Sequence, residues 1–134
     1  MLWTAKHCLK AGMLNYVNGH GVTAKRVIYG AGDRVLFELD RPMFTRFAKI
    51  GPPPKQGDRI RFWGNPRGNV SWYRVGYVVA VEGDDIVIDA YACPGDSGAA
   101  LYSDAGRIVG VLAHLTVRSD TAECRFTVGI TPLP

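Results

Sequence analysis

Glycine- and proline-containing turns divide the second half of this chain into six short apolar runs, and this pattern limits the fold more than any other feature. The runs alternate β-branched and aromatic residues with polar ones, and no long segment repeats apolar residues with the period of a helix. Six strands of this kind can close an antiparallel barrel, which leaves no unpaired strand edge. We therefore expect an all-β fold with strands over residues 59–63, 72–82, 86–90, 99–102, 107–113 and 125–130.

The first half of the chain predicts fewer strands. Short apolar alternation occurs on both sides of a glycine-rich turn at residues 18–21, which favours a hairpin. The run over residues 2–5 predicts the end of a strand that delivers His7 into a turn, and Asp33 opens a further apolar run. We expect about four strands here, over residues 2–5, 14–17, 22–29 and 35–39.

A proline-rich segment separates the two halves. Pro52, Pro53 and Pro54 lie between two glycines. Because proline fixes the backbone angle φ and lacks an N–H donor, this segment cannot continue a strand. The sequence therefore predicts three parts: a partial N-terminal β-barrel over residues 1–50, an interbarrel linker over residues 51–57, and a six-stranded β-barrel over residues 58–134.

Ser97 lies in a turn between two strand-like runs, within the sequence CPGDSG of residues 93–98. Gly95 and Gly98 lack a Cβ, so the backbone can turn sharply and direct the N–H groups of Gly95 and Ser97 into one hollow that suits an oxyanion. A serine hydroxyl is a weak nucleophile and needs a histidine base with a carboxylate to orient it. Candidates for both lie upstream in the chain.

Three segments together resemble those of the trypsin-like serine proteases. The run TAKHC (residues 4–8) resembles the family's histidine segment, GDRV (residues 32–35) its aspartate segment, and CPGDSG its nucleophile loop. The order His, Asp, Ser is that of chymotrypsin, whereas α/β-hydrolases run Ser, acid, His. Residues 57–78 are similar to the start of the second barrel in HtrA-like and other compact bacterial or viral members.

This resemblance implies two antiparallel β-barrels of chymotrypsin type, the N-terminal one incomplete because its first strands have no counterpart before His7. It implies a serine endopeptidase in which His7, Asp33 and Ser97 are the catalytic residues, with the Gly95 and Ser97 amides as the oxyanion hole. It also implies that Asp96 is a buried structural carboxylate, which a cation or backbone donors must satisfy. Catalysis of this type needs no metal and no cofactor.

The resemblance also assigns substrate contacts and a disulfide. It places Tyr91 at the base of the specificity pocket, so we expect no preference for Arg or Lys. Ala113, His114 and Leu115 would form the edge strand that pairs with a polypeptide substrate. Cys93 and Cys124 would be bridged and Cys8 left alone, although the three cysteines by themselves leave open whether any disulfide forms. Unpaired edges of the incomplete barrel predict a homo-oligomer.

The rival interpretation is a catalytically inactive β-barrel module that binds peptide or nucleic acid. Arginines at 59, 61, 67 and 74 lie near Trp63, Trp72 and Tyr73, and such sets can grip single strands. On alternating strands, however, we expect these aromatic side chains to face the core. The formal charge of +4 comes from scattered residues, which disfavours nucleic acid as a partner. No apolar run approaches the ~18 residues of a membrane span, and no signal peptide is recognisable, so the compartment is left open.

Overall fold

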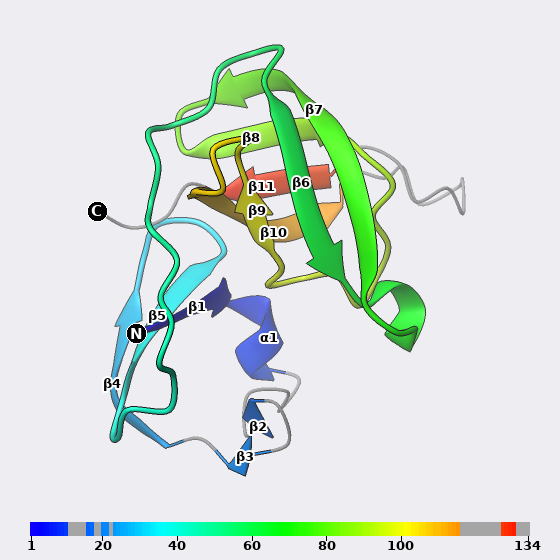
Figure 1. Ribbon diagram of the computed structural model, residues 1–134. Helices are drawn as coiled ribbons and strands as arrows, with labels where there is room; N and C mark the ends of the chain where they lie inside the picture. Colours follow the sequence, from blue (N-terminus) through cyan, green and yellow to red (C-terminus); the bar gives the residue numbers. More distant parts are fainter. Residues whose placement is uncertain (11–15, 18–19, 22, 116–126, 131–134) are drawn as a thin grey trace.

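The second half of the chain forms a closed six-stranded barrel (Figure 1). The computed structural model describes residues 1–10, 16–17, 20–21, 23–115 and 127–130. The barrel order is β10-β11-β8-β7-β6-β9, and its strand pairs are antiparallel. Its strands are β6 (Arg59–Gly64), β7 (Trp72–Glu82), β8 (Asp85–Asp89), β9 (Ala100–Tyr102), β10 (Ile108–Leu115) and β11 (Thr127–Ile130). The six expected strands are confirmed, and their ends differ from the expected ones by at most two residues.

Side chains that point alternately inward and outward along the strands build the barrel core. On β6, Ile60 and Phe62 are fully buried while Trp63 is half exposed. The core also contains side chains from the other strands: Val78, Ile86, Ile88, Leu101, Val109 and Leu112. Because neighbouring residues of a strand face opposite sides, the phase set by Ile60 and Phe62 puts Trp63 outside. The expectation that the aromatic residues of β6 and β7 face the core was therefore wrong for Trp63, Trp72 and Tyr73, which are all 43–53% exposed.

The first half forms a smaller open sheet. Strands β1 (Leu2–Ala5), β4 (Ala24–Tyr29) and β5 (Arg34–Leu39) pair in the order β1-β5-β4. Between β1 and β4 lie a one-turn helix α1 (His7–Lys10) and the two-residue strands β2 (Tyr16–Val17) and β3 (His20–Gly21), which pair with each other. The expected hairpin therefore has its second strand at residues 20–21, inside the segment 18–21 that we expected to be the turn. The sequence predicted an incomplete barrel here, and the described residues of this half indeed form an open sheet.

The central strand β5 carries the packing of this sheet. Residues Val35, Leu36 and Phe37 are at least 93% buried, whereas most of β4 is exposed. Strands β1 and β4 are the edges of the sheet in the described part of the chain. Pairing of copies through these edges stays a prediction.

The segment between the two sheets runs along the side of both (Figure 1). Residues 40–58 form no strand, apart from a single parallel bridge between Ile50 and Ile108. Two hydrogen bonds hold the bridge: the Gly51 N–H donates to the Ile108 carbonyl over 2.8 Å, and the Ile108 N–H donates to the Lys49 carbonyl over 2.9 Å. The linker is therefore attached to β10, although its boundaries at 51 and 57 stay a prediction.

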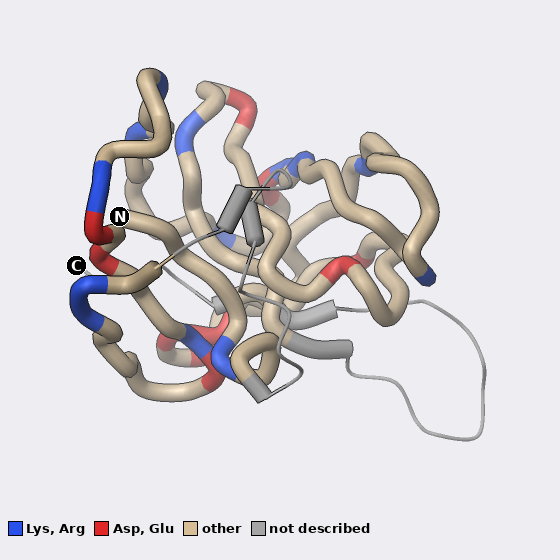
Figure 2. The backbone as a smooth tube through the Cα atoms, turned by 90° about the horizontal axis from the view of Figure 1, so that it is seen from below, with Lys and Arg blue, Asp and Glu red and all other residues tan. Residues whose placement is uncertain are grey.

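Charged residues of both signs are intermixed over the molecule (Figure 2). In that view, the Lys and Arg positions of the described residues lie in separate places along the trace. In the described part of the chain, no helix has the length and apolar character that crossing a membrane requires.

Candidate active site

His7 and Asp33 are joined by two contacts. The backbone N–H of His7 donates to Oδ1 of Asp33 over 2.8 Å. The imidazole Nδ1 lies 2.5 Å from Oδ2 of the same carboxylate. Both side chains are partly exposed, 45% for His7 and 25% for Asp33. Because both carboxylate oxygens are engaged, the imidazole is held by Nδ1 and its Nε2 edge is left for another partner.

The pairing of β1 with β5 produces this contact. In the register of the two strands Ala5 faces Arg34, so the residues that leave the sheet at this end, Lys6 and Asp33, are neighbours. The Lys6 N–H donates to the Asp33 carbonyl over 3.0 Å, which extends the ladder by one bond. His7 then begins α1. The antiparallel pairing thus brings together two residues that lie 26 positions apart.

Ser97 lies in the loop that connects β8 to β9. The loop borders a pocket of about 420 Å³ between the first sheet and the barrel. Residues from three segments line this pocket: Leu2, Trp3 and Thr4 of β1, Trp63, Gly64 and Asn65 at the end of β6, and residues 95–99. The pocket therefore combines the nucleophile loop with the strand that leads directly to His7.

Close contacts join the nucleophile loop to β1 and α1. A Cβ at Gly98 would lie 2.6 Å from Oγ1 of Thr4, and Gly98 has a φ of +88°. A side chain at this position would be strained and would clash, so only glycine lets the loop approach β1 this closely. The Cys8 Sγ lies 3.9 Å from the Ser97 carbonyl oxygen. Ser97 thus lies beside the segment that carries His7, while its hydroxyl has no hydrogen-bond partner among the described residues.

Two backbone amides beside Ser97 are available to a ligand. Within the described part of the chain, neither the Gly95 N–H nor the Ser97 N–H has a hydrogen-bond acceptor. The intervening Asp96 N–H donates to the Cys93 carbonyl over 3.1 Å. Gly95 has a φ of +104°, a conformation that L side chains rarely adopt. The two amides expected to form an oxyanion hole are therefore uncommitted on a turn that requires glycine.

Asp96 is buried and paired with an arginine. Its side chain is fully buried and makes a two-pronged ion pair with Arg74 of β7, in which both N···O distances are 2.6 Å. Oδ2 of Asp96 also accepts from the Cys93 N–H over 2.9 Å. The expectation that a cation or backbone donors satisfy this carboxylate is confirmed: the cation is Arg74, and the backbone donor is the Cys93 N–H.

Comparison with known proteins identifies the family. The trypsin-like peptidase domain matches residues 2–111 of this sequence. The chain belongs to the trypsin-like peptidase domain family.

Solved structures of trypsin-like serine proteases share the fold. A serine-to-alanine mutant of Rv3671c from M. tuberculosis, in its inactive form, superposes with a TM-score of 0.70 at 19% identity, covering 96% of this chain and 70% of that one. Kallikrein-related peptidase 10 in complex with Zn²⁺ superposes with a TM-score of 0.72 at 16% identity, covering 96% of this chain and 78% of that one. The HtrA-type protease AlgW with a decapeptide superposes with a TM-score of 0.73 at 22% identity, covering 96% of this chain and 44% of that one. At these identities the likeness shows the chymotrypsin-like fold.

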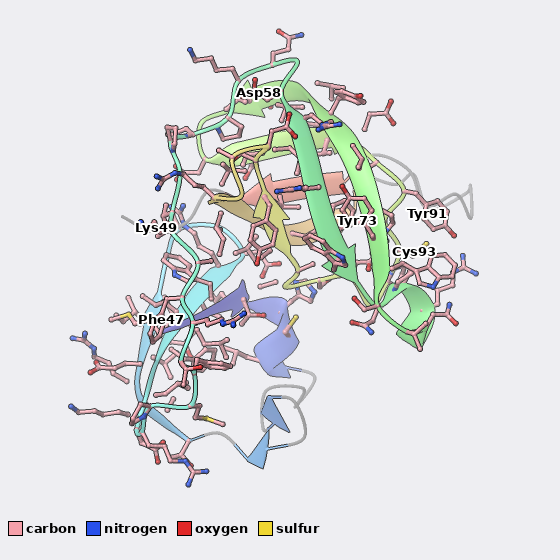
Figure 3. The ribbon with its side chains drawn as sticks, viewed as in Figure 1. Phe47, Lys49, Asp58, Tyr73, Tyr91 and Cys93 are labelled. Atoms are coloured by element: carbon pink, nitrogen blue, oxygen red, sulfur yellow. The ribbon has the colours of Figure 1, made fainter. Side chains whose placement is uncertain are left out.

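The structure does not bring every candidate substrate residue of this trypsin-like peptidase into the pocket. Tyr91 is 52% exposed and stacks on Trp72, with ring centroids 6.5 Å apart. Figure 3 shows it with Cys93 on the side of the barrel where the chain after β8 passes β7. Tyr91 does not line the pocket beside Ser97. Its part in substrate binding stays a prediction.

The backbone of residues 113–115 suits the expected edge. His114 and Leu115 of β10 pair with β11 on one side. On the other side, pairing of β10 with the chain before β9 ends where the Leu112 N–H donates to the Ala99 carbonyl. Beyond that point no described residue pairs with Ala113, His114 or Leu115 on this side. Among the described residues this side of the segment thus has no backbone partner, although Ala113 itself is fully buried. Its pairing with a substrate stays a prediction.

The cysteines of this trypsin-like peptidase domain differ in state. Cys93 is disulfide-bonded, and Cys8 is a buried free thiol. Cys124, the partner that the family resemblance implies for Cys93, lies outside the described residues. Among the residues that the structure describes, no group of three or more His, Cys, Asp or Glu side chains could hold a metal ion.

Two residues of the site were not predicted from the sequence. We expected Arg74 to lie on the surface with Arg59, Arg61 and Arg67, yet Arg74 is buried and its guanidinium lies 4.6 Å from the Phe62 ring centroid. The sequence pattern that could have indicated this is the two-residue period of β7, because Arg74 lies on the same face of the strand as Gly76 and Val78. The second missed residue is Trp63, which lines the pocket beside Ser97 because of the phase of β6.

Proposed function

We propose that this trypsin-like peptidase domain is a serine endopeptidase that cleaves peptide bonds with Ser97, His7 and Asp33. The observation that carries the proposal is the double contact between His7 and Asp33. His7 lies three residues after Thr4, and Thr4 lines the pocket beside Ser97. A carboxylate on Nδ1 leaves Nε2 of the imidazole to serve as a base. Residues 95–99 and Thr4 line one pocket, which supports a common site.

In the proposed reaction, Ser97 Oγ attacks the carbonyl carbon of a peptide bond while His7 takes the hydroxyl proton. The C=O bond opens to a tetrahedral oxyanion, which the Gly95 and Ser97 N–H groups receive. His7 then donates its proton to the leaving amine, and the acyl group stays on Ser97. Water, deprotonated by His7, then attacks this ester; the bond between the acyl carbon and Ser97 Oγ breaks, His7 returns the proton to Oγ, and the second product leaves as an acid. Asp33 holds the imidazole and stabilises its charged form.

The structure also supports a route for the substrate backbone. An extended peptide could add to the open edge of residues 113–115, with the bond to be cut beside Ser97. The Gly98 N–H donates to the Leu112 carbonyl over 2.8 Å, which attaches the nucleophile loop to the strand just before this edge. Side-chain preference is not assigned, because Tyr91 lies away from the pocket.

Covalent labelling tests the proposal. A fluorophosphonate probe phosphonylates an activated serine, so the wild-type chain should be labelled at Ser97, with labelling abolished by Ser97→Ala and by His7→Ala. Ser103→Ala is a matched control, because this serine lies on the turn after β9 with its hydroxyl 3.4 Å from the Arg107 N–H. Labelling at another serine, or no labelling of a folded wild-type chain, would exclude this mechanism and favour a peptide-binding module.

A further inference from the structure

A second pocket lies next to the pocket beside Ser97, where the segment between the two sheets passes β1 and the barrel. It has a volume of about 590 Å³, and its lining includes Leu2, Trp3, Phe44, Phe47, Ile108 and Val111. Figure 3 shows Phe47 where the linker runs past the first sheet. We call this space the linker pocket. It shares Leu2, Trp3 and Gly98 with the pocket beside Ser97, but Ser97 itself does not line it.

Hydrogen bonds hold the walls of the linker pocket in place. The Gly51 N–H donates to the Ile108 carbonyl over 2.8 Å, and the Ile108 N–H donates to the Lys49 carbonyl over 2.9 Å, so the linker is attached to β10. Another wall is β1, which is held by its pairing with β5. A preformed hollow of several hundred Å³ is the usual form of a small-molecule site. The linker pocket therefore exists without a ligand to shape it.

The lining of this pocket is mostly apolar and partly open to solvent. Phe47 is 76% exposed and Ile50 is 51% exposed at its entrance, whereas Val111 is buried. Large apolar side chains that stay in contact with water around a hollow gain free energy when an apolar ligand covers them. The lining therefore favours a ligand with an apolar chain.

Among the described residues that line the linker pocket, Arg46 alone has a charged side chain, and none has a carboxylate. Arg46 makes no ion pair or hydrogen bond with any residue in the part of the chain that the structure describes. A guanidinium presents a planar fork of N–H donors that fits the two oxygens of a carboxylate. An unpaired guanidinium on an apolar pocket is thus complementary to an anion that carries an apolar chain.

We infer that the linker pocket is a binding site for a monocarboxylate with an unbranched apolar chain. The carboxylate pairs with Arg46, and the chain packs on the apolar lining. The ligand lies against Gly98, the residue after the proposed nucleophile. Because Ser97 does not line the pocket, this site is separate from the proposed catalytic site and does not depend on peptidase activity.

Isothermal titration calorimetry of the whole chain with decanoate, below its critical micelle concentration, tests the site. The wild-type chain should bind decanoate at least about tenfold more tightly than butanoate, because each CH₂ group removed from water strengthens binding. Arg46→Gln should weaken decanoate binding by about tenfold, since it removes one charge-assisted contact, and should leave decanol binding unchanged. Lys49→Gln is the matched control, because Lys49 is an exposed cation of the same segment that does not line the pocket. It should bind decanoate like the wild type.

Two further variants locate the ligand. Trp63→Ala and Ser97→Ala change the pocket beside Ser97 and leave the linker pocket intact, so both should bind decanoate like the wild type. No binding to the folded wild-type chain, or equal affinities of the wild type and Arg46→Gln, would overturn the inference. A loss in Trp63→Ala as large as that in Arg46→Gln would also overturn it, because the ligand would then lie beside Ser97. Calorimetry needs no activity, so a lack of fluorophosphonate labelling would count against the proposed reaction and not against this site.

Discussion

Asp33 contacts His7 through both of its carboxylate oxygens, one on the backbone N–H and one on the ring. The backbone contact fixes where α1 begins, and the ring contact fixes the direction of the imidazole. A carboxamide could keep the first contact with its oxygen, but it would place its NH2 group against the ring and so change the second. The pair therefore separates the role of Asp33 in folding from its role in the proposed reaction.

Asp33→Asn should slow the proposed reaction by about 10⁴-fold, because an amide favours the imidazole tautomer that cannot accept the Ser97 proton. The fold should persist, since the amide oxygen can still accept from the His7 N–H. Labelling rate and circular dichroism of the variant check this prediction. A variant that reacts at the wild-type rate would show that Asp33 does not orient a catalytic base.

Phe62→Ala should lower the free energy of unfolding by about 3–5 kcal/mol, because it opens a cavity in a core where Phe62 has no exposed surface. Trp63→Ala is the matched control: the side chain is of similar size, but it is 48% exposed on the opposite face of β6. Its effect on stability should be markedly smaller. Urea denaturation of both variants makes the comparison, and equal losses would contradict the register of β6.

Gly64→Ala should destabilise the barrel by about 1–3 kcal/mol, because its methyl group would overlap two buried charged side chains that cannot move away. Gly57→Ala serves as a comparison, since Gly57 has a φ of +90° but no atom within 4 Å of the new methyl group. Its cost should come from backbone strain alone. Only Gly64→Ala should also slow labelling at Ser97. If both variants label alike, the packing at Gly64 has no influence on the loop.

Burial raises the pKa of the Cys8 thiol above its usual value, and a hydrogen bond with Thr4 opposes the shift more weakly. Because the thiolate is the reactive form, iodoacetamide should alkylate Cys8 in the native chain more slowly than in urea, and the native rate should rise at a higher pH. Because the pKa of Cys8 is higher in the folded state than in the unfolded state, the folded state loses stability as pH rises from the unfolded-state pKa through the folded-state pKa. Mass spectrometry of alkylated Cys8 against pH measures this. Identical native and unfolded profiles would contradict its burial.

Local sequence was sufficient for the strands of the barrel. Alternation and turn residues predicted β7 over residues 72–82 with both ends correct. Such patterns are local because a strand that buries one face needs an apolar residue at every second position. The same local information put Arg74 on one face of β7 with Val78, but it could not say that this face is buried, since the opposite face carries Tyr73, Val75 and Tyr77. The closed barrel decided which face is inside, and it buried Arg74.

The sequence by itself determined the family segments, the six strands of the second barrel and the glycines that allow the turn at Ser97, because each depends on residues close together along the chain. Only the tertiary structure decided which groups meet. The register of β1 against β5 brought His7 to Asp33, and the curvature of the closed barrel brought Arg74 to Asp96. Pairing across long loops depends on packing of the whole core, and short sequence patterns do not encode it.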